Sequence, residues 1–136
     1  MIEIYAVGGY NEVGKNCTAI RVDDEAVIID LGIYLESYIK LTEDEDILNI
    51  NPEKLMKVGA IPDISAISQI MDKVKAVIIS HAHLDHLGAV PYLADKFDAP
   101  IIGTPFTIEV IKSILNEDKI TLRNKIITLN SNSSYN

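Results

Sequence analysis

The chain has 136 residues, of which 48% are apolar, and a net charge of −8 at pH 7. This length fits one domain with a sizeable core, and the composition is that of a soluble globular protein. No apolar run approaches the roughly 20 residues that span a bilayer, and the N-terminus lacks the pattern of a signal peptide. The single cysteine, Cys17, excludes an internal disulfide and indicates a small buried residue in a reducing compartment. We therefore expect a cytoplasmic protein without a membrane partner.

Three strands joined by short connections are predicted at the N-terminus. The first, "IEIYAVGG", ends at the paired glycines Gly8 and Gly9, and the second, "NCTAIRV", alternates in polarity. The third, "AVIIDLG", is continuously apolar, as a buried strand is, and stops at Asp30. Because the connections are short, we expect the three strands to pair antiparallel.

The pattern of residues 36–75 is less regular. A cluster of four acidic residues is interpreted as a solvated loop: Glu43, Asp44, Glu45 and Asp46. A short helix is predicted at "NPEKLMKVG", where Asn51 is a capping residue and Pro52 occupies the first helical position. A second helix is predicted at "PDISAISQIMDK".

The second half of the chain alternates strands with helices. Strands are predicted at "KAVIIS", "APIIGT" and "KIITLN", and helices at "DHLGAVPYLADKF" and "PFTIEVIKSILNE", the latter with Thr104 as its cap. This order predicts parallel strands with helices packed against the sheet. The whole sequence therefore predicts an α/β fold with a mixed sheet and outer helices.

All three histidines of the chain lie within residues 81–86, "HAHLDH". This stretch follows a predicted buried strand, and ligands of α/β sheets bind beyond the carboxyl ends of strands. His81 and His83 point the same way in an extended segment, and after the turn Asp85 and His86 face a second position. Imidazole and carboxylate groups suit zinc, with manganese as an alternative. We interpret the four residues as metal ligands, since isolated structural or surface histidines would not gather in one place.

Two arrangements of these ligands are open. In the first, two metal ions about 3.5–4 Å apart clamp the attacking and leaving oxygens of a phosphoryl transfer and lower the pKa of a bridging water. In the second, the three imidazoles gather on one ion. The negative net charge argues against a nucleic-acid partner, although bound divalent ions would offset it.

The sequence "SHAHLDH" resembles the H-x-H-x-D-H signature of the metallo-β-lactamase superfamily, and "VIIDLG" resembles its first motif. The opening "GGYNEVGKNCTAI" is similar to the G-G-x-x-E-[IV]-G-K-N start of the ribonuclease J family of β-CASP nucleases, and "MKVGAIPD" is similar to its archaeal members. The resemblance covers nearly the whole chain. It implies the N-terminal half of an αββα fold, and RNA hydrolysis from the 5′ end with endonucleolytic cleavage as a second mode.

The resemblance also implies a role for each of the four ligands. His81 and His83 would bind the first zinc ion, and Asp85 and His86 would bind the second. Asp85 would in addition orient the attacking water, so that Asp85 and His86 are the expected catalytic residues.

Two further features acquire a role by the same resemblance. Asp30 would hydrogen-bond to a ligand histidine and orient it; otherwise Asp30 is a turn-forming aspartate after a strand. A loop containing Gly8, Gly9 and Gly14 would shape the site; otherwise it is a plain hairpin turn.

The chain departs from the family pattern after His86, because no histidine follows it. The resemblance therefore implies that residues 1–136 are a partial metallo-β-lactamase domain, without the remaining ligands, the C-terminal half or the β-CASP domain. We expect weak zinc or manganese binding, no activity of this chain alone, and self-association through uncovered apolar surface. RNA is the expected partner of the full-length enzyme. The alternatives are a hydrolase of the superfamily with another substrate, and a catalytically inactive module that associates with itself or a partner.

Overall fold

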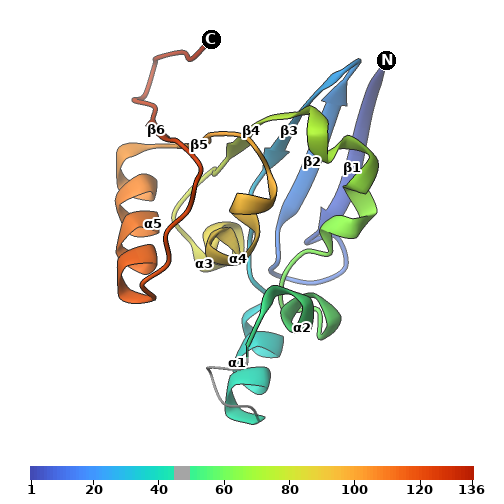
Figure 1. Ribbon diagram of the computed structural model, residues 1–136, viewed down its shortest axis with the longest axis vertical. Coiled ribbons are helices and arrows are strands. Elements are labelled where there is room, and N and C mark those ends of the chain that lie inside the picture. The colour runs from blue at the N-terminus through green and yellow to red at the C-terminus, as the bar shows by residue number, and fades with distance from the viewer. Residues whose placement is uncertain (45–49) are drawn as a thin grey trace.

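The computed structural model describes residues 1–44 and 50–136, and its centre is a six-stranded sheet (Figure 1). The strands lie side by side in chain order, as β1 Ile2–Gly8, β2 Cys17–Val22, β3 Glu25–Ile29, β4 Val74–Ile78, β5 Ile101–Gly103 and β6 Ile126–Thr128. β1, β2 and β3 pair antiparallel, whereas the pairs β3–β4, β4–β5 and β5–β6 are parallel. The predicted mixed sheet is confirmed.

All strands except β2 run in the same direction. β2 is antiparallel to both of its neighbours, so β1 is parallel to β3 and, through the parallel pairs, to β4, β5 and β6. The segments that follow these strands therefore leave the sheet at the same edge, which we call the carboxyl edge. The loop 9–16, Asp30 and the histidine stretch 81–86 all belong to these segments. The strand directions by themselves thus bring the sequence motifs to one edge of the molecule.

Seven helical segments connect the strands in the described part of the chain: α1 Leu35–Asp44, α2 Pro52–Lys57, η2 Ile64–Lys73, α3 Leu84–Leu87, α4 Val90–Leu93, η3 Ala94–Lys96 and α5 Pro105–Glu117. Of these, η2 and η3 are 3₁₀ helices, and α1 and α2 extend beyond one end of the sheet (Figure 1). Among the described residues, no helix has the length and apolar character needed to cross a membrane.

The helix α1 corrects the interpretation of the acidic cluster as a loop. Glu43 and Asp44 form the last turn of α1, while Glu45 and Asp46 lie outside the described residues. Only Leu41 of α1 is buried. Leu35 and Ile39 of α1 are exposed, so this helix packs little against the rest of the described chain.

The single helix predicted at 85–97 is wrong, because α3 and α4 are separate. Gly88 caps the C-terminus of α3, and Pro91 lies in the first turn of α4. A Cβ atom added at Gly88 would lie 2.6 Å from Leu84 O and 2.7 Å from a side-chain carbon of Ile33. The missing side chain thus lets α3 pack closely, and the missing N–H of Pro91 prevents a continuous helix. α5 agrees with its prediction, with the Thr104 side chain accepting a hydrogen bond from Thr107 N.

The core lies between one face of the sheet and the helices. Its largest fully buried side chains come from the strands, the helices and the connections, and include Ile28, Leu31, Leu55, Ile67, Ile70, Ile79, Leu87, Leu93, Phe97, Ile101 and Ile108. Along each strand, alternate residues point away from this core. The sheet therefore has a second face, which the helices do not cover.

The second face of the sheet is lined by aliphatic side chains that are paired across the strands. We call it the outer sheet face and define it by nine residues: Ile2, Ile4, Ile20, Val22, Val27, Ile29, Ile78, Ile102 and Ile127. None of the nine belongs to the hydrophobic core cluster, but Ile102 is only 7% exposed and lies beside residues 129–133. Ile2 and Ile4 are 70% and 69% exposed. Exposed apolar surface of this kind is typical of surfaces that bind another protein surface.

Candidate metal centre

The four predicted ligands gather beyond the end of β4, at the carboxyl edge. The ring centroids of His81 and His86 are 4.0 Å apart, and those of His81 and His83 are 4.7 Å apart. Asp85 Oδ2 lies 3.3 Å from His86 Nε2. His83 immediately precedes α3, so the end of a strand and the start of a helix hold the cluster. The structure brings the four side chains to one end of the sheet, whereas their role as ligands remains a prediction.

The cluster is arranged as two pairs of donor atoms. His81 Nε2 and His83 Nδ1 are 3.2 Å apart, and Asp85 Oδ2 and His86 Nε2 are 3.3 Å apart. Two ligand atoms that each lie about 2.1 Å from a tetrahedral zinc ion are separated by about 3.4 Å. Each pair therefore has the spacing of two ligands on one ion.

The number of donors is smaller than a closed site requires. Catalytic zinc usually has three protein ligands, and each pair supplies two. Within residues 1–44 and 50–136, no group of three or more histidine, cysteine, aspartate or glutamate side chains is placed to hold one ion. The arrangement in which three imidazoles share an ion is therefore not what the structure shows. The donor types and their spacing suit divalent metal ions, but each pair has one ligand fewer than catalytic zinc usually has.

Asp30 lies directly beneath the cluster, as predicted. Its Oδ2 is 2.7 Å from His86 Nδ1, and its Oδ1 accepts a hydrogen bond of 2.7 Å from Ser80 N. Only 6% of Asp30 is exposed, and its φ of +64° is uncommon outside glycine. A carboxylate accepts only, so His86 donates its Nδ1 proton to Asp30, and Nε2 is the ring nitrogen that remains for other contacts. This tautomer is the one in which Nε2 can bind a metal.

Ser80 connects Asp30 to His81, a contact that sequence analysis missed. Its Oγ lies 2.9 Å from Asp30 Oδ2 and 3.0 Å from His81 Nδ1. The hydroxyl donates its proton to the carboxylate and accepts the Nδ1 proton of His81, which leaves the His81 Nε2 lone pair facing His83. One buried carboxylate thus sets the tautomers of two histidines. The signal in the sequence was a hydroxyl residue between a buried strand and the first histidine.

The glycine-rich loop packs beside this network. A Cβ atom on Gly8 would lie 2.2 Å from Lys15 O, and one on Gly9, whose φ is +84°, would lie 2.4 Å from Asn16 Oδ1. Gly14 has a φ of +135°, and a Cβ atom on it would lie 3.1 Å from Ile33 O, in the segment after β3. Because the side chain of Asn16 in turn contacts Asp85 and His86, the loop borders the site as the sequence predicts. Its functional role remains a prediction.

Cys17 is buried near Asp30 at the start of β2. Burial raises the pKa of the Cys17 thiol to about 12, and the negative charge of Asp30 contributes in the same direction. The side chain is therefore a protonated thiol at neutral pH, as expected of a core residue.

We expect Cys17 of the folded chain to react with iodoacetamide at pH 8 about a hundredfold or more slowly than in the urea-unfolded chain, because the thiolate is scarce and buried. Mass spectrometry of timed samples measures both rates. Rapid labelling of the folded chain would show that Cys17 is accessible and would contradict its place in the core.

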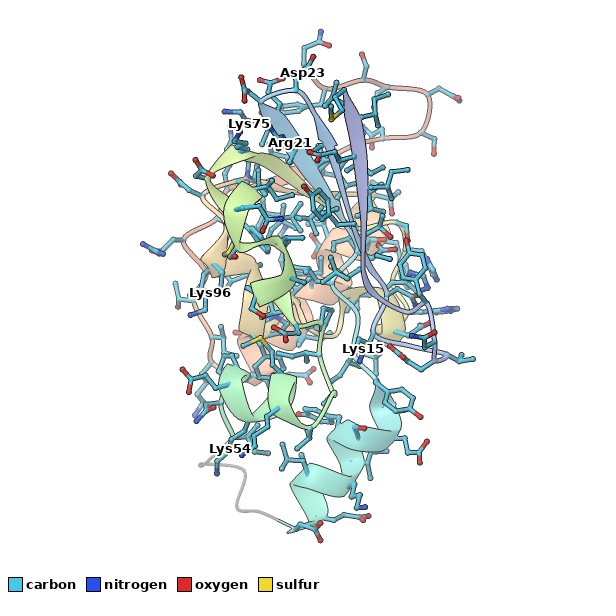
Figure 2. All side chains as sticks on the ribbon, turned by 90° about the vertical axis from the view of Figure 1, so that its right-hand side faces the viewer. Lys15, Arg21, Asp23, Lys54, Lys75 and Lys96 are labelled. Atoms are coloured by element: carbon cyan, nitrogen blue, oxygen red, sulfur yellow. The ribbon has the colours of Figure 1, made fainter. Side chains whose placement is uncertain are left out.

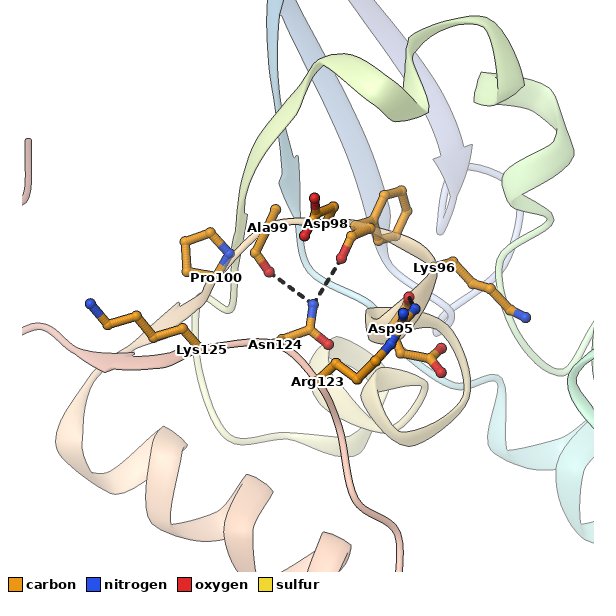
Figure 3. Close-up of a pocket in the computed structure, with 9 residues that line it drawn as sticks. Asp95, Lys96, Asp98, Ala99, Pro100, Arg123, Asn124 and Lys125 are labelled. Atoms are coloured by element: carbon orange, nitrogen blue, oxygen red, sulfur yellow. Dashed lines mark hydrogen bonds between the residues drawn. The ribbon is translucent and has the colours of Figure 1, made fainter.

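A surface depression of about 640 Å³ lies away from the histidine cluster (Figure 3). It lies at the opposite edge of the sheet, where the chain enters β5 and β6. There the Asn124 side chain donates to the carbonyl oxygens of Ala94, Phe97 and Ala99, at 2.9, 3.0 and 2.8 Å. Asn124 thereby ties the entry of β6 to the turn before β5, which is a structural role.

Five labelled basic side chains are spread over the length of the molecule. Figure 2 shows Lys15 beside α1, Lys54 on α2, Lys96 at mid-height, and Lys75 with Arg21 at the far end of the sheet. Arg21 is also paired with Glu3 at 3.0 Å. These five residues do not line a common groove, and the sequence has 12 basic against 20 acidic residues.

The metallo-β-lactamase superfamily profile matches residues 10–112, a range that includes Asp30 and the whole histidine cluster. The chain belongs to the metallo-β-lactamase superfamily. It is 48% identical over 134 residues to ribonuclease J of Methanocaldococcus jannaschii and 45% identical over 132 residues to ribonuclease J of Pyrococcus abyssi. These matches cover 98% and 96% of this chain, but the chain spans only 30% and 29% of the two relatives.

Solved structures agree with this assignment at the level of the fold. The crystal structure of the flavodiiron protein from Giardia intestinalis matches 88% of this chain and 24% of its own, with a TM-score of 0.52 and 20% sequence identity. Such a likeness supports the α/β fold of the superfamily and carries no information about the substrate.

Proposed function

We propose that this chain is the N-terminal part of a metal-dependent ribonuclease that acts from the 5′ end of RNA and also cleaves internally. The proposal depends mainly on the spacing of the four donor atoms. His81 Nε2 lies 3.2 Å from His83 Nδ1, and Asp85 Oδ2 lies 3.3 Å from His86 Nε2. The similarity to ribonucleases J along nearly the whole chain supports RNA as the substrate. Zinc is the proposed metal, manganese the alternative, and the cytoplasm the proposed compartment.

The proposed division of labour follows from the contacts. Two bound divalent ions would supply an activated water and offset charge on the phosphodiester. His81 and His83 hold one position, and Asp85 and His86 the other. Asp85 is also proposed to orient the attacking water. Asp30 fixes the imidazoles directly and through Ser80, and fixed ligands are a precondition for placing a reactive group accurately.

The remaining ligands and the RNA-binding surface are proposed to lie outside residues 1–136. Four donors in two pairs leave each ion one protein ligand short, and the net charge of −8 is unfavourable for RNA binding by this chain alone. We therefore expect the 136-residue chain alone to bind zinc weakly and to leave RNA intact. A catalytically inactive, self-associating module is the second candidate, and the exposed outer sheet face favours it for the chain by itself.

A segment exchange tests the proposed function. Residues 1–134 of this chain would replace the matching segment of M. jannaschii ribonuclease J, to which it is 48% identical. We expect the chimera to degrade 5′-labelled RNA in the presence of zinc or manganese, because the M. jannaschii part of the chimera supplies the remaining metal ligands. The rate constant is read from gels of timed samples.

The His81→Ala chimera is the control for activity. It removes one donor of the first pair and is expected to lower the rate by a factor of about a thousand or more, since metal-assisted hydrolysis depends on an intact clamp. A chimera that is folded and inert, or an alanine variant as active as the parent, would refute the ribonuclease role and favour the inactive module.

A further inference from the structure

The residue that ends the glycine-rich loop, Asn16, contacts both members of the Asp85–His86 pair. Its Nδ2 lies 2.9 Å from Asp85 O, 3.2 Å from Asp85 Oδ2 and 3.3 Å from His86 Nε2. Since Asp85 Oδ2 and His86 Nε2 are themselves 3.3 Å apart, the three side-chain atoms form a nearly equilateral triangle. The amide nitrogen thus faces the same two atoms that are proposed to bind a metal ion.

The direction of these hydrogen bonds follows from the chemistry of the groups. An amide nitrogen donates only, and its two hydrogens face three acceptors, of which the two on Asp85 are nearer. In neutral His86, which gives its Nδ1 proton to Asp30, the lone pair of Nε2 shares one of these hydrogens. A carboxylate oxygen has a second lone pair to offer, whereas Nε2 of a neutral imidazole has one. A metal ion and Asn16 can therefore share Asp85, but they compete for His86.

The backbone fixes Asn16 in this position. Asn16 N donates to Asp85 O at 3.0 Å, and Asn16 O accepts from Gly32 N at 2.9 Å. Gly9 lies behind the side chain, where a Cβ atom would approach Asn16 Oδ1 to 2.4 Å. The amide is held between the loop and Asp85, so its contacts with the pair follow from the fold.

We propose that Asn16 is a positioning residue: it holds Asp85 and His86 at ligand spacing before a divalent ion binds, and it releases His86 Nε2 when the ion arrives. Its hydrogen bonds to Asp85 persist in the loaded site. This proposal rests on the metal-binding role proposed above for Asp85 and His86. The proposal explains why residue 16 is an asparagine, because its amide nitrogen donates hydrogen bonds to the pair. It also explains why Gly9 lies next to it, because a side chain there would collide with the Asn16 amide.

Two substitutions of Asn16 are expected to have opposite effects on zinc affinity. Asn16→Ala removes the donor and frees the side chains of the pair, and loss of such an orienting contact costs about 10–100-fold in metal affinity. Asn16→Asp keeps the shape but puts a carboxylate at the third corner of the triangle, which gives the ion three donors. We expect it to raise the affinity about tenfold or more, since affinity grows with ligand number and charge.

The measurement is a zinc titration of the 136-residue chain at pH 8, followed by the histidine ring signals in NMR spectra. Asn51→Asp is the matched control, because it adds the same charge at the cap of α2, where aspartate also serves as a cap. It should leave the zinc affinity within about twofold of the parent. In the metal-free chain, Asn16→Ala should also shift the ¹⁵N resonance of His86 Nε2, because the nitrogen loses its donor.

The outcomes separate this proposal from the one on which it rests. Zinc binding that falls equally in Asn16→Ala and Asn16→Asp would show a merely structural residue and overturn the positioning role. An unchanged Nε2 resonance in Asn16→Ala would overturn it as well. If neither the parent chain nor Asn16→Asp binds zinc at His86, the proposed metal site itself is refuted.

Discussion

Replacing Asp30 by alanine is expected to lower the free energy of unfolding by about 3–5 kcal/mol, the range found when a buried charged network loses one partner. The carboxylate accepts hydrogen bonds from Ser80 N, Ser80 Oγ and His86 Nδ1. Alanine leaves these donors without their acceptor in a place where Asp30 is 6% exposed. Each buried donor left unsatisfied costs about 1–3 kcal/mol. Urea unfolding followed by circular dichroism measures the change.

Two variants separate the hydrogen bonds from the backbone conformation. Asp30→Asn keeps one acceptor oxygen and tolerates a positive φ, so its loss of stability should be smaller, about 1–3 kcal/mol. Asp23→Ala is the matched control, because Asp23 also has a positive φ, of +52°, but its side chain is 76% exposed and pairs with the N-terminus at the surface. It should cost less than about 1 kcal/mol. Equal losses in Asp23→Ala and Asp30→Ala would show that the backbone, and not the carboxylate network, accounts for the effect.

The 136-residue chain is expected to self-associate through the outer sheet face. Nine aliphatic side chains line this face in cross-strand register, and the exposed part of it lies at Ile2, Ile4 and Val22 of β1 and β2. Burying such a surface between two copies gains roughly 25 cal/mol per Å² of apolar area. Sedimentation velocity over a range of protein concentrations should therefore show species larger than the monomer.

A lysine on the outer sheet face should weaken this association. Ile4 is 69% exposed, so Ile4→Lys costs the monomer little, whereas in the associated state it would bury an unpaired charge. We expect the association constant to fall about tenfold or more. Val13→Lys is the matched control, since Val13 is 95% exposed in the loop 9–16, away from the face. A chain that stays monomeric at high concentration, or that responds equally to both substitutions, would exclude this face as the contact.

The strands and their order could be predicted because their signals are local. "AVIID" and "KAVIIS" are apolar runs bounded by polar residues, and β3 and β4 lie where these runs predict. The parallel second half followed from the alternation of strands and helices. Elements whose limits depend on tertiary packing were harder to predict from the sequence. α1 buries only Leu41, and the close packing of α3 at Gly88 depends on Ile33, a residue distant in sequence.

In the candidate site, too, some features followed from the sequence and others only from the tertiary structure. The spacing of His81, His83, Asp85 and His86 is a property of six consecutive residues, so the sequence by itself determined the donors and their place after a strand. The proximity of Asp30 also followed from sequence, through the resemblance of "VIIDLG" to a known motif.

Only the tertiary structure decided how these donors are oriented and completed. The grouping into two pairs, the contact of Ser80 with His81, and the contacts of Asn16 with Asp85 and His86 join residues 1 to 70 positions apart. Tautomers and donor spacings are set by such contacts, because a hydrogen bond depends on distance and angle in space and not on order along the chain. The outer sheet face has the same origin: alternation along each strand predicts two faces, but which face the helices cover is decided when the strands and helices pack.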